Sequence, residues 1–369
     1  MKHLLHPLSF SLSLLAGWFS SLSLTAQTAI VSLPPHPDPM GVSAPFAGQT
    51  PQGLLVAGGC NFPNVPAAEG GKKVFYDKVY RLRLNPERPE ASTWDTLPPL
   101  PDSLAYGAIA ATEQGLVCIG GRTPRGMSCK TFIINSQTGT IESLPPLPVK
   151  MAEGCAVALG NAVYACGGEQ DGGQCGLYRL RLDSSVGWER LKDYPGTPRL
   201  QPVLATDGKA LFLMGGFYFD KDKRRCILPE EILVYRPESN RWHRQGRLPK
   251  RPGCRRRGLV GATSVALGET VYVAGGVNPD LFCQAVEGHA PADYLKQPPQ
   301  WYGFNDCLWA LHTSNGRWQA TLTDARLARA GGIITTDGHR LYMICGETKP
   351  GIRSPQITAI DIVDMVKNP

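Results

Sequence analysis

Gly115-Leu116-Val117-Cys118-Ile119-Gly120-Gly121 is the stretch that decides the fold, because its pattern of an apolar run followed by a glycine pair recurs along the chain. A short apolar run bounded by glycine is typical of a buried strand. In the last copy we expect Glu347 to replace the second glycine, after Gly346. The six copies are residues 53–59, 115–121, 162–168, 210–216, 270–276 and 341–347.

A tyrosine and a tryptophan follow these runs at similar places in several units. The tyrosines are Tyr80, Tyr178 and Tyr235, and the tryptophans are Trp94, Trp188, Trp242 and Trp318, with Ile141 at this place in the second unit. Each unit predicts one small antiparallel sheet that cannot bury both faces alone, so that sheets packed radially would bury them. We expect the glycine pairs to form tight turns and the tryptophans to fill space between blades.

The order of apolar run, Gly-Gly, Tyr and Trp resembles the kelch repeat. The chain is therefore predicted to be all-β, with residues 27–369 forming a six-bladed kelch-type β-propeller. The last unit has one later strand, at residues 357–363, and residues 29–33 form a spare strand near the N-terminus. We expect these two ends to close the ring within one blade.

The first 26 residues predict a secretory signal peptide, because Lys2 precedes the Ser-rich apolar run of residues 8–24 and Leu24-Thr25-Ala26 ends in the small residue that signal peptidase prefers. The serines and the short length argue against the alternative, a membrane anchor. The formal net charge of +7 is compatible with an anionic small molecule. The basic cluster in residues 250–257 lacks aromatic residues, so we interpret it as a solvated loop and expect no nucleic-acid partner.

The eleven cysteines cannot all pair within the chain, because their number is odd. Cys118, Cys166 and Cys345 recur at the end of the apolar runs, which indicates small buried hydrophobic residues. Cys226 and Cys254 are a candidate disulfide pair. Neither the cysteines nor the histidines have the spacing of metal ligands, so no metal or other cofactor is expected.

Most of the extra length in the longer units falls directly after the glycine pair. These connections are residues 60–77, 217–230, 277–305 and 347–354. In a propeller the same connection of every blade lies on the same face, so these loops should surround one end of the channel. Binding sites are commonly built from such loops.

Five motifs in these loops and before the strands resemble those of the kelch-type N-acetylneuraminate epimerases, or sialic acid mutarotases. The motifs are Gly346-Glu347-Thr348-Lys349-Pro350-Gly351-Ile352-Arg353, Gly275-Gly276-Val277-Asn278, Phe304-Asn305, Pro195-Gly196-Thr197-Pro198-Arg199 and Glu69-Gly70-Gly71-Lys72-Lys73. Their order along the chain is rotated, because the Glu347 motif ends this chain. The resemblance is therefore to a cyclically permuted branch of the family. A closed ring of blades is spatially unchanged by such a permutation.

The resemblance implies that Glu347 is the proton acceptor and that Arg353 holds the sugar carboxylate. Substrate contacts are expected from Arg199, Asn278, Asn305, Arg329, Lys72 and Lys349. Other interpretations stay open for several of them. Glu347 and Arg353 could form a loop salt bridge, Asn278 could cap a turn, Arg329 could pair with an acid between blades, and Lys72 could be solvated.

The function implied by the resemblance is that of an isomerase. It would interconvert the α- and β-anomers of free N-acetylneuraminate without a cofactor, by acid- and base-assisted opening and closure of the sugar ring. An exported member of this family is expected in the periplasm. A mutarotase of another acidic sugar, or a non-catalytic propeller that binds a glycan or a protein, would have the same ring of blades. The sequence leaves the oligomeric state open.

Overall fold

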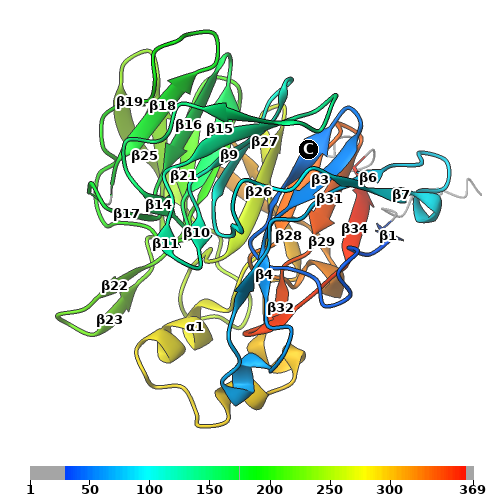
Figure 1. The fold of residues 1–369 in the computed structure, drawn as a ribbon. Helices are drawn as coiled ribbons and strands as arrows, with labels where there is room; N and C mark the ends of the chain where they lie inside the picture. The colour runs from blue at the N-terminus through cyan, green and yellow to red at the C-terminus, as the bar shows by residue number, and fades with distance from the viewer. Residues whose placement is uncertain (1–29, 174, 363–369) are drawn as a thin grey trace, which may run out of the picture.

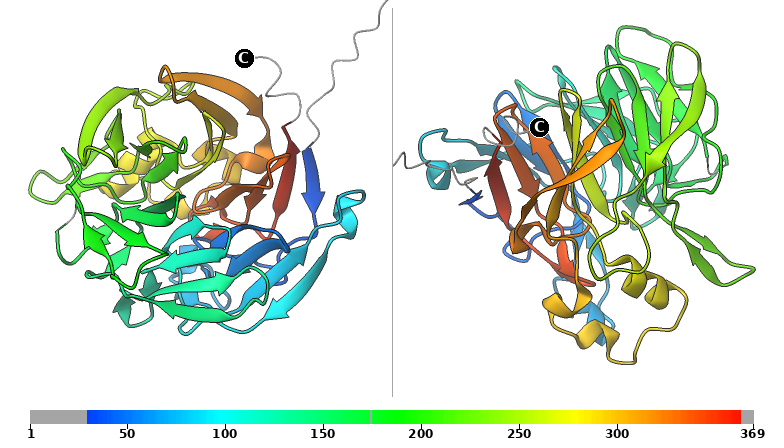
Figure 2. Two further views of the ribbon diagram at one scale, coloured as in Figure 1. Left: turned by 90° about the horizontal axis from the view of Figure 1, so that it is seen from above. Right: turned by 180° about the vertical axis from the view of Figure 1, so that it is seen from behind.

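The computed structural model describes residues 30–173 and 175–362, which form six four-stranded antiparallel sheets around a central channel. The left view of Figure 2 looks down this channel. The prediction of an all-β, six-bladed propeller is confirmed. The predicted signal peptide, residues 1–26, lies outside the described residues.

The blades are numbered in chain order, and their strands run from the channel outward. The first two are β2 (Phe46–Thr50), β3 (Gly53–Ala57), β6 (Val79–Arg83), β7 (Thr93–Leu97), and β8 (Ala108–Ala111), β9 (Gly115–Ile119), β12 (Thr131–Asn135), β13 (Ile141–Leu144). The next two are β15 (Cys155–Leu159), β16 (Ala162–Cys166), β18 (Leu177–Arg181), β19 (Glu189–Arg190), and β20 (Val203–Thr206), β21 (Leu211–Met214), β24 (Glu231–Arg236), β25 (Arg241–Arg247). The last two are β26 (Ala262–Leu267), β27 (Thr270–Gly275), β28 (Cys307–His312), β29 (Arg317–Thr323), and β30 (Ile333–Thr336), β31 (Arg340–Ile344), β34 (Ile357–Asp361), β1 (Ile30–Leu33).

The N-terminal strand β1 closes the ring by pairing with β34, the last strand of the sixth blade. The pairing is antiparallel, with Ile30 opposite Ile360 and Leu33 opposite Ile357. The innermost strands of neighbouring blades contact one another around the whole circle, from β2 to β30 and back to β2. The predicted closure by the two ends of the chain is therefore confirmed (Figure 2).

The hydrophobic core is divided into six layers, each between two neighbouring blades. Cys118, Cys166 and Cys345 are fully buried in these layers, as predicted for small apolar residues. The four tryptophans each donate an indole hydrogen bond to a backbone carbonyl of the preceding blade or its exit segment. The bonds are Trp94 to Pro35 (2.8 Å), Trp188 to Pro145 (2.9 Å), Trp242 to Lys192 (2.9 Å) and Trp318 to Arg247 (3.0 Å).

The turn after each apolar run uses two successive residues with positive φ. In five blades both are glycine, as in Gly120 (φ 61°) and Gly121 (φ 101°). In the sixth blade they are Cys345 (φ 51°) and Gly346 (φ 100°). The prediction that Glu347 replaces the second glycine is therefore wrong, because Cys345 takes the place of the first. Glu347 is the residue that follows the pair, which places it at the start of the next connection.

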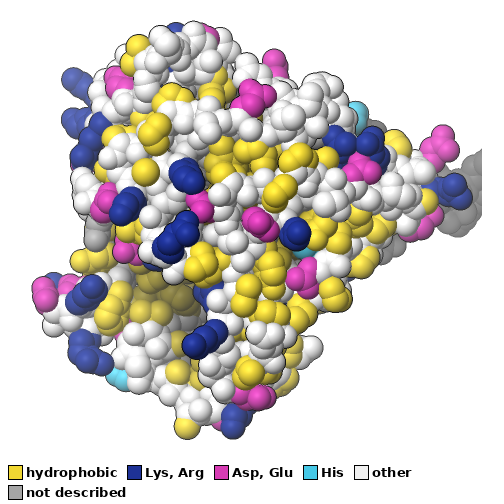
Figure 3. Space-filling model, viewed as in Figure 1, with side chains coloured by type: hydrophobic (Ala, Val, Ile, Leu, Met, Phe, Trp, Pro, Cys, Tyr) yellow, Lys and Arg dark blue, Asp and Glu magenta, His cyan; other side chains and the backbone are white. Residues whose placement is uncertain are grey.

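These connections extend from one end of the ring and form a cap over the channel (Figure 1). Its elements are β4 (Cys60–Asn61), β5 (Val74–Phe75), β10 (Arg122–Thr123), β11 (Gly126–Met127), β14 (Met151–Ala152), β17 (Glu169–Gln170), β22 (Tyr218–Asp220), β23 (Arg225–Ile227), α1 (Pro279–Val286), β32 (Glu347–Lys349) and β33 (Ile352–Arg353). The space-filling view shows a hollow between the blades and this cap (Figure 3). None of the described helices is long and apolar enough to cross a bilayer.

Two further expectations from the sequence differ from the structure. Cys226 and Cys254 are not bonded to each other, and all eleven cysteines are free thiols. The basic cluster is only partly solvated, because Arg251 donates to the carbonyls of Val277 and Gly303. Arg257 likewise donates to a backbone carbonyl within its own loop. These arginines therefore tie loops together at the cap end of the ring.

Candidate functional site

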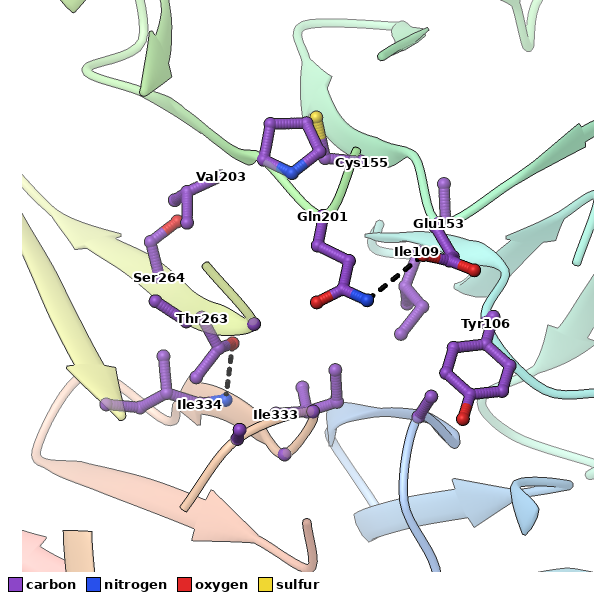
Figure 4. A pocket seen from close by; sticks show the side chains of 18 of the residues that line it. Tyr106, Ile109, Glu153, Cys155, Gln201, Val203, Thr263, Ser264, Ile333 and Ile334 are labelled. Carbon is purple, nitrogen blue, oxygen red and sulfur yellow. Dashed lines mark hydrogen bonds between the residues drawn. The ribbon is translucent and has the colours of Figure 1, made fainter. Parts of the chain in front are cut away.

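A cavity of about 690 Å³ occupies the channel and opens beneath the cap. Innermost strands of all six blades line it, and α1 and the following loop contribute Phe282, Tyr294 and Phe304. The walls deep in the channel are mostly small or apolar, such as Ile109 and Val203 (Figure 4). Polar side chains gather at the cap end. This size is within the usual range for small-molecule sites.

Six equivalent residues surround the cap end of the cavity, one before each innermost strand. They are Ala44, Tyr106, Glu153, Gln201, Gly261 and Gly331, and all have φ between 51° and 63°. Backbone hydrogen bonds of 2.7–3.0 Å join five of the six neighbouring pairs, and each N–H donates to the carbonyl of the preceding blade. We call this set the necklace. The left-handed backbone costs energy for every residue except glycine.

The necklace is asymmetric around the channel. Tyr106, Glu153 and Gln201 occupy three successive blades and carry long polar side chains. Gly261, Gly331 and Ala44 occupy the other three and carry almost none, so the cavity has free space on their side.

Glu347 lies on the wall beside this open half of the necklace. Its backbone forms two hydrogen bonds with Ala330, of 2.8 and 2.9 Å, which hold the start of β32 against the entry of the innermost strand. Its side chain lines the cavity, and 23% of that side chain is exposed. Arg353, opposite Glu347 in the β32–β33 hairpin, donates from Nη1 to the carboxylate at 2.5 Å.

Arg353 is placed behind the carboxylate and has only 4% of its side chain exposed. Its Nε donates to the carbonyl of Cys60 at 3.4 Å, and its guanidinium lies 4.9 Å from the centre of the Phe62 ring. Nη2 makes no hydrogen bond within the described part of the chain. The structure thus brings the two predicted catalytic residues together, with Glu347 in front and Arg353 supporting it.

Burial raises the pKa of the Glu347 carboxyl above its usual value. The Arg353 guanidinium, the backbone N–H of Gly351 and the Lys73 ammonium oppose this shift. A carboxylate that is partly desolvated but still paired with a cation is a stronger proton acceptor than one in water. The arrangement can therefore act as a general base.

A second charged cluster lies across the cavity from the open half of the necklace. Arg122 donates to Glu169 at 2.5 Å and to Glu153 at 3.4 Å. Gln201 donates to the other oxygen of Glu153 at 3.0 Å (Figure 4). This cluster presents carboxylate and amide groups to the cavity, and its own charges are partly compensated.

Arg199 and Arg329, two predicted substrate contacts, are fully buried inside blades and do not line the cavity. Arg199 forms an ion pair with Glu231 at 2.7 Å and donates to the carbonyl of Gly215. Arg329 donates to the carbonyls of Arg326, Gln356 and Met343 and to the hydroxyl of Thr358. Burial lowers the pKa of Arg329 to about 10. Among the described residues Arg329 forms no ion pair, so the alternative that it pairs with an acid between blades is wrong.

The remaining predicted contacts also lie outside the cavity wall. Asn278 is the N-cap of α1, and its side-chain oxygen accepts from the N–H groups of residues 280 and 281. Asn305 is buried, with its amide bonded to Cys307 and Trp309. Lys349 donates to the carbonyls of residues 295 and 297, and Lys72 is exposed. Direct contact between these side chains and a substrate stays a prediction.

Tyr106, Glu153 and Gln201 line the cavity but were not among the residues predicted from the sequence. Each stands fourteen residues before the first residue of its turn pair, as do the other three members of the necklace. This constant spacing is visible in the sequence. The spacing can be interpreted only once the ring of blades is known, because a fixed offset does not show which side chains face the channel.

Among residues 30–173 and 175–362, no three His, Cys, Asp or Glu side chains form a group that could hold a metal ion.

Comparisons with known proteins place the chain among sugar-acid epimerases. The sequence model of the family described as N-acetylneuraminate epimerase matches residues 144–367, more than half of the chain. The N-acetylneuraminate epimerase of Haemophilus influenzae strain PittEE is 33% identical over 194 residues, which are 49% of this chain and 50% of that protein. The Yersinia enterocolitica N-acetylneuraminate epimerase is 29% identical over 196 residues, 49% of this chain and 48% of that protein.

The chain spans about half the length of the curated relatives that it matches. The solved structure titled "Structure of YjhT" is similar with a TM-score of 0.62, covering 89% of this chain and 99% of that one at 12% identity. That likeness supports the propeller fold. Because the family model matches most of the chain, this protein belongs to the N-acetylneuraminate epimerase family.

Proposed function

We propose that this protein interconverts the α- and β-anomers of free N-acetylneuraminate. The observation that carries the proposal is the Glu347 carboxylate, which faces the cavity while Arg353 pairs with it from behind at 2.5 Å. Family membership supports the substrate, and the fold places the carboxylate beside the open half of the necklace. We further propose that residues 1–26 direct the protein to the periplasm.

The chemistry requires that the cyclic hemiketal opens and closes again on the other face. Glu347 removes the proton of the anomeric hydroxyl as the bond between the anomeric carbon and the ring oxygen breaks, while an acid protonates that oxygen. Closure returns both protons. The raised pKa of Glu347 suits a base that must take up a proton and then release it.

Arg353 supports this step in the proposal. Its Nη1 orients the carboxylate and keeps it ionised, as a guanidinium does for a partly buried acid. That Arg353 also holds the sugar carboxylate, as a planar guanidinium can, stays a prediction, because its side chain is 4% exposed and does not line the cavity. The walls around the open half of the necklace would hold the sugar ring by contact with small residues.

The proposal is tested by proton NMR of freshly released α-N-acetylneuraminate, at a pH where spontaneous anomerisation is slow. The wild-type protein should accelerate conversion to the β-anomer, and Glu347→Gln should not. Folded wild-type protein that gives no acceleration sinks the assignment. Saturable binding without turnover would then indicate a binding propeller, and turnover of another sugar acid would indicate a related mutarotase. Equal rates for both proteins would keep the activity and remove Glu347 as the base.

A further inference from the structure

Tyr106 occupies a costly position in the necklace. It has φ 61°, where the equivalent residues of two other blades are glycine. A bulky residue in this conformation is uncommon and is held there by its surroundings, and such strain gathers at functional sites. The side chain projects into the cavity (Figure 4). The fold therefore has a tyrosine at a position where the backbone conformation favours glycine, and the phenol of this tyrosine lines the cavity.

The phenol oxygen of Tyr106 accepts a hydrogen bond from the Lys73 ammonium at 2.7 Å. The Cys60 sulfur lies 3.5 Å from the same oxygen and 3.6 Å from the Ser43 carbonyl, and its one hydrogen can serve only one of them. A lysine ammonium is a donor only, so it cannot take the phenol proton as an acceptor. Among the described residues the acceptor within reach of the Tyr106 hydroxyl proton is the Cys60 sulfur, which is a weak acceptor. A stronger acceptor in the cavity can therefore take that proton.

Cys60 connects this phenol to the ion pair. Its carbonyl accepts from Arg353, and the same guanidinium holds Glu347. The charge of Glu347 contributes to raising the pKa of Tyr106, although burial is the larger cause. The phenol therefore stays protonated at neutral pH. It also lies on the same wall as the carboxylate, with only the Cys60 segment between them.

We infer that Tyr106 is the general acid that protonates the ring oxygen when the hemiketal opens, and that Lys73 is its positioning residue. The inference rests on the proposed function and completes it. The two oxygens that exchange protons are bonded to the same carbon, so their acid and base must share one wall of the cavity. Tyr106 and Glu347 are the two groups that meet this requirement through the contacts above.

The step balances in protons and electrons. Glu347 takes the proton of the anomeric hydroxyl, the carbonyl forms, the bond to the ring oxygen breaks, and that oxygen takes the proton of Tyr106. This leaves an open-chain keto acid, a neutral Glu347 carboxyl and a phenolate, which the Lys73 ammonium stabilises at 2.7 Å. On closure the phenolate takes the proton back, and Glu347 returns its own to the carbonyl oxygen.

The test measures the anomerisation of α-N-acetylneuraminate by wild-type, Tyr106→Phe, Lys73→Met and Lys73→Arg proteins. Loss of a general acid typically costs about 10²- to 10⁴-fold in rate, so Tyr106→Phe should lower kcat by at least about 10²-fold and change KM little. Lys73→Met should lower kcat by about 10-fold, and Lys73→Arg should restore most of it. The exposed Lys73 can be replaced without disturbing a core.

Tyr80→Phe is the matched control, because Tyr80 packs edge-on against Trp94 away from the cavity. It should keep wild-type kcat, and circular dichroism should show that all variants fold. An active wild type with an equally active Tyr106→Phe overturns the inference and leaves the proposed function standing. A severe loss in Lys73→Met with an active Tyr106→Phe also overturns it, since Lys73 would then be the acid. An inactive wild type removes the proposed function itself.

Discussion

Two of the arginine–glutamate pairs in this propeller bury the arginine almost completely, and they do different things. Arg353 and Glu347 pair at 2.5 Å, with 4% and 23% of their side chains exposed. Arg199 and Glu231 pair at 2.7 Å, with 0% and 29% exposed. Residue types, distances and burial are nearly the same. Only Glu347 lines the cavity, whereas the second pair joins the entry of the fourth blade to β24.

In this fold, the position of an ion pair within the blade decides whether its carboxylate can take part in a reaction. Glu347 follows the turn pair and so points over the channel mouth, while Glu231 begins an outer strand. The Glu347 carboxylate is exposed to the cavity, whereas the Glu231 carboxylate is paired with Arg199 inside the blade.

The largest effect is expected when the two glutamates are replaced in the same way. Glu347→Gln should lower the rate of anomerisation by about 10²- to 10⁴-fold, because the general base is lost. Its unfolding free energy should stay within about 1 kcal/mol of wild type, since Gln still accepts from Arg353. Glu231→Gln should keep the rate per folded molecule and cost about 1–2 kcal/mol of stability. Proton NMR measures the rate and urea unfolding measures the stability of each variant. A slow Glu231→Gln protein together with an active Glu347→Gln protein would contradict the assignment of roles.

Arg329→Met should be the most destabilising of the single changes. The four groups that accept from Arg329 lie in the interior and would be left without their donor. Breaking a buried charged network of this kind costs about 3–5 kcal/mol. The midpoint of urea unfolding should fall accordingly, while the folded fraction retains its rate constant. A folded, stable but inactive Arg329→Met would show instead that this residue serves the substrate.

The dependence of the rate on pH should distinguish Arg353 from Arg199. The rate should fall as the pH drops through the pKa of Glu347, because the protonated carboxyl cannot accept a proton. Burial places this midpoint above the usual glutamate value. Arg353 opposes that shift, so Arg353→Gln should raise the midpoint further, by about one unit or more. Arg199→Gln should leave the midpoint of the residual activity unchanged. An unchanged midpoint in Arg353→Gln would contradict the coupling.

The smallest effect is expected at the blade contacts far from the cavity. Trp242→Phe removes the hydrogen bond to the carbonyl of Lys192 but keeps an aromatic ring between the blades. A loss of about 0.5–1.5 kcal/mol in unfolding free energy is expected, with an unchanged rate. Differential scanning calorimetry measures the first and NMR the second. A change in rate would show that the blade contact reaches the site.

Much of the fold followed from local pattern, because each blade repeats a short apolar strand and a left-handed turn. The number of blades, the closure by β1 and β34 and the face that carries the cap were predicted in this way. One error came from the same pattern. Cys345 adopts the left-handed conformation that glycine favours, so the turn of the sixth blade was misplaced by one residue.

The site was predicted only in part. Glu347 and Arg353 share one hairpin, so a local motif was enough to bring them together. Arg199 and Asn305 belong to motifs that resemble the same family, yet their side chains, like that of Arg329, satisfy backbone carbonyls inside the blades. Tyr106 and Lys73 come from neighbouring blades and meet at the cap end of the ring. No short sequence motif includes both residues, so the sequence does not indicate this contact.

The sequence by itself determined the repeating unit, because a run of apolar residues and a turn conformation depend on neighbours along the chain. The tertiary structure alone decided which polar groups face the cavity. The closed ring brings six equivalent residues together in the necklace. The side chain of each one then determines how much space and which polar groups its part of the cavity has. Small residues left room beside Glu347, and Tyr106 follows them in the necklace, next to Ala44. Such an arrangement depends on distances between blades, which residue spacing along the chain does not encode.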